Sequence, residues 1–165
     1  MDPRAARLAG GFTLIELMVV VVIASILMSI AIPSYMSQVR QSRRVEAKTA
    51  LLDLAGREER YFSTSITGAN YSQTTTDVGY PVGAWPQVVG SGYYTVTVCA
   101  VGPGMAAACP PSNQTAPGYA ITATPVAGQS QASDNQCQSF SVDNTGTQWA
   151  TDVHGNNTTA LCWSN

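Results

Sequence analysis

The dominant feature of the hydrophobicity pattern is an apolar segment from Phe12 to Ile32, in which Glu16 is the only charged residue. Its 21 residues, at the α-helical rise of about 1.5 Å per residue, match the roughly 30 Å hydrocarbon layer of a bilayer. The pattern therefore predicts a membrane-spanning helix. A carboxylate inside such a helix is costly unless it is paired, so Glu16 is a candidate functional residue. The plainer interpretation places Glu16 at the level of the lipid headgroups.

Beyond this segment the pattern becomes that of an amphipathic helix. Pro33 lacks a backbone donor and clashes with the preceding turn, so we expect a kink there in a helix that continues. Apolar residues then recur at spacings of three, four and seven, namely Ala47, Leu51, Leu54, Ala55, Tyr61 and Phe62. We expect one helix over residues 12–63, membrane-buried at 12–32 and packed in its second half against a sheet of the same chain.

The rest of the chain predicts a small antiparallel sheet. Residues 63–92 are rich in Thr, Gly and Ser and have no sustained period, which indicates a loop. Alternation and turn residues predict four strands, at 93–98, 119–124, 139–142 and 147–150. The expected fold class is α+β, with a long, kinked N-terminal helix packed on a four-stranded antiparallel sheet.

Charge is distributed unevenly along the chain. All eight Lys and Arg residues precede Tyr61, whereas the segment after it has four Asp residues and no basic residue. Nonspecific DNA affinity comes mainly from basic groups that neutralise phosphates, so nucleic acid is not favoured as a partner of this distal segment. Four basic residues follow the apolar segment between Arg40 and Lys48, against Arg4 and Arg7 before it. This bias opposes an N-inside orientation, but long domains translocate largely regardless of such charges.

All four cysteines, Cys99, Cys109, Cys137 and Cys162, lie in the distal segment. An even number beyond a membrane-targeting segment predicts disulfides and an oxidising compartment such as the periplasm; four free buried thiols are the alternative. The spacing lacks the close Cys/His pairs of a zinc site, so no metal is expected. Of the three connectivities, we favour Cys99–Cys109 with Cys137–Cys162, because the strand around Tyr119 can then pair without threading through a covalent ring.

No cluster of residues predicts catalysis. His154 lies near Asp152 in a Gly/Asn-rich loop, and a lone histidine in such a loop is interpreted as solvated. Neither a nucleophile motif nor a phosphate-binding glycine loop accompanies it. We therefore expect no catalytic residues and no cofactor, and we do not expect an enzyme.

The N-terminal third resembles a known class of proteins. A short basic leader, Gly10-Gly11 and the sequence FTLIEL resemble the class III signal of type IV prepilins and pseudopilins, and residues 31–35 (AIPSY) match the helix continuation found there. The resemblance implies a leader of residues 1–11, cleavage between Gly11 and Phe12, and methylation of the new Phe12 amine by the prepilin peptidase. It also implies that the helix enters a filament core, where Glu16 neutralises the Phe12 amine of a neighbouring pilin.

Residues 39–62 resemble the helix of minor pilins of the PilE type more closely than that of major pilins. The late Cys137-x-x-Phe140, Thr145-Gly146 and Cys162-Trp163 fit the same group, while the segment from Cys99 to Cys109 departs from an elementary pilin head. The resemblance implies the type IV pilin fold with a head at residues 64–165.

The function implied by this resemblance is that of a structural subunit of a type IV pilus, which supports pilus assembly, surface attachment and twitching motility. The prepilin would sit in the inner membrane with its head in the periplasm, and the mature subunit in an extracellular homo- or hetero-oligomeric filament. Two alternatives remain open: a pseudopilin of type II secretion and a minor pilin of DNA uptake.

Overall fold

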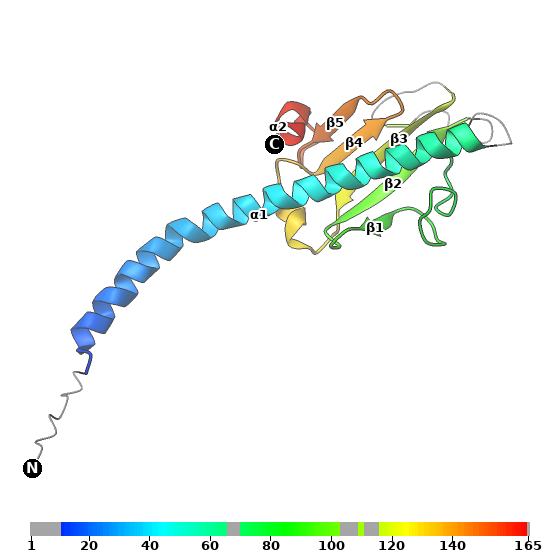
Figure 1. The fold of residues 1–165 in the computed structure, drawn as a ribbon. Helices are drawn as coiled ribbons and strands as arrows, with labels where there is room; N and C mark the ends of the chain where they lie inside the picture. Colours follow the sequence, from blue (N-terminus) through cyan, green and yellow to red (C-terminus); the bar gives the residue numbers. More distant parts are fainter. Residues whose placement is uncertain (1–10, 66–69, 103–108, 111–115, 165) are drawn as a thin grey trace, which may run out of the picture. The chain divides into compact units, whose positions relative to one another are not determined.

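A computed structural model describes residues 11–65, 70–102, 109–110 and 116–164. The chain divides into two compact units, Met1–Val39 and Arg40–Asn165. Helix α1, Leu14–Thr64, runs through 51 residues and contributes to both units. Pro33 lies inside this helix, which continues through it without a break (Figure 1). The kink expected at Pro33 stays a prediction.

The second unit contains one antiparallel sheet. Its strands are β1 (Gln87–Val89), β2 (Tyr94–Val101), β3 (Gly118–Pro125), β4 (Ser139–Asp143) and β5 (Gln148–Thr151), and they pair in the order β1-β2-β3-β4-β5. A short 3₁₀-helix, η1 (Ser130–Ser133), precedes β4, and the helix α2 (Thr159–Trp163) follows β5. Every connection joins sequence neighbours, so the sheet is a simple meander.

The strand count of four was wrong, because the sheet has five strands. β1 lies within the segment 63–92 that was expected to be a loop, and it pairs with β2 through Val89 and Tyr94. Three residues are too few to display a period of two, so the sequence pattern could not reveal it. Gly90 and Gly92, both at positive φ, form the turn between the two strands. Gly90 also has a steric role, since a Cβ there would overlap the Glu46 carboxylate.

The hydrophobic core lies between α1 and one face of the sheet (Figure 1). Ala47, Leu51 and Leu54 of α1 are fully buried, as the apolar spacing predicted. They pack in one cluster with alternate residues of the strands, including Val96 and Phe140. Full burial of a leucine side chain contributes about 1.5 to 3 kcal/mol. This packing fixes the C-terminal part of α1 as a structural element of the head.

Aromatic residues fasten the segment between α1 and β1 to this core. Tyr71 is buried, stacks on Phe62 with ring centroids 4.7 Å apart, and meets Tyr119 edge-on at 4.6 Å. Trp85 donates its indole N–H to the carbonyl of Gln73 at 2.8 Å. Residues 70–86 are therefore held in a defined path although they have little regular structure.

Candidate functional site

The apolar part of α1 is the first candidate site. Its most apolar 18-residue window has a mean hydropathy of 2.7, and none of that window is buried inside the chain. Ile15, Leu27 and Ile30 are each more than half exposed. By length and composition this helix can cross a membrane. None of the residues of this window is buried among the described residues, so its apolar side chains are available to lipid or to other helices.

Thr13 begins this helix as its N-cap. The Thr13 hydroxyl oxygen accepts the backbone N–H of Glu16 at 3.3 Å, and the Thr13 carbonyl accepts the N–H of Leu17 at 3.2 Å. Thr13 and Glu16 have the spacing of a capping box, a signal that the sequence analysis missed. Glu16 thus lies in the first turn, where the helix dipole favours a negative charge.

The predicted processing and assembly residues lie at this end of the helix. Gly11 and Phe12 precede α1, and the Phe12 side chain is exposed. Residues 1–10 of the predicted leader lie outside the described residues. The roles of Gly11, Phe12, Glu16 and Pro33 in processing and assembly stay predictions.

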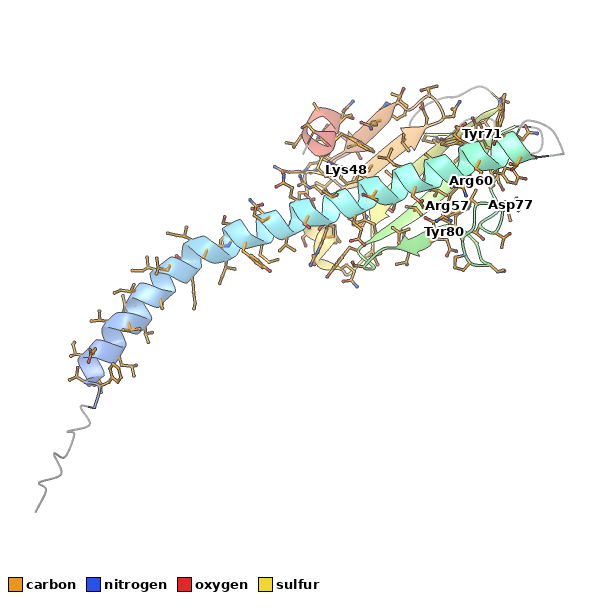
Figure 2. The ribbon with its side chains drawn as sticks, viewed as in Figure 1. Lys48, Arg57, Arg60, Tyr71, Asp77 and Tyr80 are labelled. Carbon is orange, nitrogen blue, oxygen red and sulfur yellow. A yellow bond between two sulfur atoms is a disulfide. The ribbon has the colours of Figure 1, made fainter. Side chains whose placement is uncertain are left out.

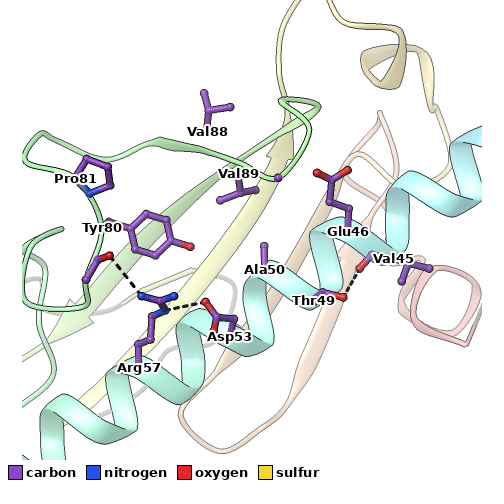
Figure 3. A pocket seen from close by; sticks show the side chains of 12 residues that line it. Val45, Glu46, Thr49, Ala50, Asp53, Arg57, Tyr80, Pro81, Val88 and Val89 are labelled. Atoms are coloured by element: carbon purple, nitrogen blue, oxygen red, sulfur yellow. Dashed lines mark hydrogen bonds and ion pairs between the residues drawn. The ribbon is translucent and has the colours of Figure 1, made fainter.

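The second candidate site is a groove of about 630 Å³ between α1 and β1 (Figure 3). Its lining comes from Val45, Glu46, Thr49, Ala50, Asp53 and Arg57 of α1, from Gly79, Tyr80 and Pro81, and from Val88, Val89 and Gly90. We call it the α1–β1 groove. Figure 2 shows Arg57 on α1 close to Tyr80 of the following segment.

The charged groups of the α1–β1 groove bind other groups of the same chain. Arg57 donates to the Asp53 carboxylate at 2.7 Å and to the carbonyl of Val78 at 3.2 Å, and its guanidinium lies 5.5 Å from the centre of the Tyr80 ring. The Glu46 carboxylate accepts the backbone N–H of Ser91. These bonds hold the groove walls together and indicate a structural role.

A buried carboxyl group on α1 was not predicted. Glu58 of α1 is fully buried; its Oε2 accepts the Ser72 backbone N–H at 3.0 Å, and its Oε1 has no hydrogen-bond partner among the described residues. Burial is the main cause that raises the pKa of Glu58 from 4.5 to about 7, and the nearby Asp77 and Glu59 carboxylates add to it. The Ser72 hydrogen bond opposes the shift.

A second buried pair fastens α1 to the segment before β4. Arg44 donates through Nε and Nη2 to the two oxygens of Asp134, both at 2.7 Å, and both residues are buried. The amide of Gln131 donates to Asp134 at 3.0 Å and to the Tyr94 hydroxyl at 2.9 Å. Burial raises the pKa of Tyr94, so its hydroxyl stays protonated. The sequence showed Arg44 only as one of several basic residues.

The cysteines form the disulfides Cys99–Cys109 and Cys137–Cys162, the two pairs favoured from the sequence. The second disulfide joins α2 to the segment just before β4. It sets α2 against the core, where the indole N–H of Trp163 donates to the carbonyl of Trp149 at 2.9 Å.

The Asp152 carboxylate organises the loop between β5 and α2. His154 is exposed, and its backbone N–H donates to the Asp152 carboxylate at 2.8 Å. The Asn156 side-chain amide is the main cause that lowers the pKa of Asp152. Among the described residues no cluster of His, Cys, Asp or Glu could hold a metal ion.

Comparison with known families accounts for this combination of an exposed apolar helix and a disulfide-bonded head. Residues 33–141 match a family model described as type IV minor pilin ComP, DNA uptake sequence receptor. The chain belongs to this minor pilin family. Residues 7–32 of this minor pilin also match a prokaryotic N-terminal methylation motif, so the two matches together extend from residue 7 to residue 141. The match favours a minor pilin over a secretion pseudopilin.

Similar proteins include two further pilins. The type IV major pilin protein PilA of Myxococcus xanthus is 41% identical over 70 residues, which are 42% of this chain and 30% of that protein. The minor pilin therefore matches less than a third of that relative's length. A solved structure of a type IV pilin from Shewanella oneidensis superposes with a TM-score of 0.39 at 21% identity, covering 66% of this chain and 89% of that one.

Proposed function

We propose that this minor pilin is made as a membrane-anchored prepilin, is cleaved between Gly11 and Phe12, and enters the pilus through α1. The observation that supports the proposal best is the methylation motif at residues 7–32, which directly precedes the minor pilin match at 33–141. A prepilin peptidase that also methylates the Phe12 amine is the expected partner before assembly. Other pilin subunits are the expected partners afterwards.

The role proposed for Glu16 is charge neutralisation inside the filament. A carboxylate surrounded by apolar side chains carries a desolvation cost of several kcal/mol, which a paired cation offsets in part. The Phe12 amine of a neighbouring subunit would supply that cation. The Thr13 cap fixes Glu16 in the first turn of α1, close to its own chain terminus after cleavage.

The proposed location follows from the anchor and the disulfides. Two disulfides in the head are typical of proteins that fold in an oxidising compartment. The head would therefore lie in the periplasm while α1 holds the prepilin in the inner membrane, and it would become extracellular after assembly. In the assembled pilus the subunit would support surface attachment and twitching motility.

The experiment that tests this function is quantification of the subunit in sheared pili by mass spectrometry. Glu16→Ala should still insert and be cleaved, giving mature chains that begin at Phe12, but should be depleted about tenfold or more in pili. Glu59→Gln removes an exposed carboxylate of the head on the same helix and serves as the matched control. Normal abundance of Glu16→Ala in pili would contradict the neutralisation mechanism.

DNA uptake is the second candidate, because the family description names a DNA uptake sequence receptor. The charges of this chain support it weakly. No Lys or Arg follows Arg60, and Arg44 and Arg57 are already paired with carboxylates. The deciding measurement is binding of the full chain in non-ionic detergent to duplex DNA between about 50 and 200 mM salt. Micromolar binding that weakens steeply with salt would establish this function.

A further inference from the structure

The first three charged residues after the apolar segment are all arginines. Between Glu16 and Glu46 the chain has no acidic residue, and its only charged residues there are Arg40, Arg43 and Arg44. Membrane proteins usually carry an excess of Lys and Arg on the cytoplasmic side of a membrane-spanning segment. In a subunit whose N-terminus is cytoplasmic, these three arginines lie on the opposite side. These arginines therefore call for another explanation.

The structure separates these arginines into two kinds. Arg44 is neutralised by Asp134, as described above. Arg40 and Arg43 have no carboxylate within 4.0 Å in the described part of the chain, where the ion pairs are Arg44–Asp134 and Arg57–Asp53. Two cations thus remain without an acidic partner at the start of the head.

The head holds Arg43 by neutral groups only. Its guanidinium lies 3.7 Å from the centre of the Tyr93 ring, and it donates to the Tyr93 hydroxyl at 3.0 Å and to the Ser130 hydroxyl. These contacts orient the group and leave its charge in place. Arg40 is partly exposed, and its Nε is buried without a hydrogen-bond partner.

Their positions along α1 place both arginines near a membrane surface. Arg40 and Arg43 follow Ile32 by eight and eleven residues, which is about 12 and 16 Å of helix at 1.5 Å per residue. Arginine can keep its charged end at an interface while its stem lies along apolar surface. Tyr35 follows Ile32 by three residues and is 69% exposed, and tyrosine is enriched at membrane–water interfaces.

We propose that Arg40 and Arg43 bind the phosphate groups of anionic phospholipids in the leaflet on the head side of the membrane. The apolar segment keeps the two arginines beside lipid headgroups as long as the subunit is inserted, which favours lipid over nucleic acid as the source of the phosphate. This inference rests on the membrane-inserted state of the proposed function and not on incorporation into pili, so the two can fail separately.

The test measures lipid selectivity of the full chain reconstituted in phosphatidylcholine bilayers. Trace spin-labelled phosphatidylglycerol or phosphatidylcholine reports the fraction of each lipid held at the protein surface. A basic residue near the bilayer surface strengthens association with anionic lipid about fivefold at low salt. We expect wild type to prefer phosphatidylglycerol by at least fivefold, and the preference should disappear in about 1 M salt because the charges are then screened.

Variants identify the residues responsible. In a chain whose Arg4 and Arg7 are replaced with Gln, so that no Lys or Arg precedes the apolar segment, Arg40→Gln with Arg43→Gln should lower the preference to near one. In the same chain, Arg40→Lys with Arg43→Lys, which keeps both charges, should retain it. Arg60→Gln removes an exposed cation from the far end of α1 and should have no effect. Equal preference in wild type and the Gln variant, an equal loss in Arg60→Gln, or a wild-type preference that survives high salt would overturn the proposal. Loss of duplex DNA binding in the Gln variant with unchanged lipid preference would instead assign these arginines to nucleic acid.

Discussion

Replacing Glu58 with glutamine tests whether the head holds a buried carboxyl group that resists ionisation. Folding raises the pKa of this group from 4.5 to about 7, and the main cause is burial. Because the native state binds its proton more tightly than the unfolded state, the stabilising effect is complete below about pH 4.5. It is lost as the pH rises through the native pKa of about 7.

The size of this effect follows from the same shift. At about 1.36 kcal/mol per pKa unit, a rise from 4.5 to about 7 corresponds to about 3 kcal/mol of unfolding free energy lost by pH 8. This is a large fraction of the 5 to 15 kcal/mol that stabilises a typical domain. Glu58→Gln cannot ionise and so avoids the loss. Its stability relative to wild type should therefore increase by about 3 kcal/mol between pH 4 and pH 8.

Urea unfolding of the full chain in non-ionic detergent measures this difference. Trp85, Trp149 and Trp163 all lie in the head, so near-ultraviolet circular dichroism follows its unfolding with the disulfides intact. Comparing the two pH values cancels any constant effect of glutamine on packing. Glu59→Gln, the exposed neighbour, controls for the loss of one negative charge; because its carboxylate is only a minor cause of the raised Glu58 pKa, it should give a much smaller increase. The same stability difference between Glu58→Gln and wild type at pH 4 and pH 8 would refute the reasoning.

Three further perturbations test other parts of the molecule. Gly11→Glu should leave uncleaved precursor in the membrane, and N-terminal sequencing that found mature chains starting at Phe12 would contradict the processing site. Cys162→Ser opens a disulfide that spans 25 residues and should cost about 3 to 4 kcal/mol relative to the oxidised wild type, measured by thermal unfolding. Arg44→Met leaves Asp134 buried without its cation and should lower the free energy of unfolding by about 3 to 5 kcal/mol. Replacing both residues with apolar ones should recover most of that loss. An Arg44→Met variant as stable as wild type would refute this reasoning.

The sequence by itself determined the features that depend on local periodicity. The apolar length of residues 12–32, the spacing of Leu51 and Leu54, and the alternation in β2 and β3 each repeat over enough residues to define a helix or a strand. The disulfide pairing also followed from chain order, because joining neighbouring cysteines leaves the strand around Tyr119 outside both covalent rings. Thr13 could have been recognised from its position three residues before Glu16.

Only the tertiary structure decided the features that depend on contacts between distant segments. β1 exists because β2 supplies its hydrogen-bond partners, and its three residues have no period of their own. Glu58 looks in the sequence like one more polar residue of an amphipathic helix, yet the segment around Ser72 covers it and changes its proton affinity. Arg43 and Arg44 are adjacent and chemically identical, and they differ because Asp134, 90 residues beyond Arg44, neutralises only one of them. Burial and charge pairing arise from three-dimensional neighbours, so a local sequence pattern cannot specify them.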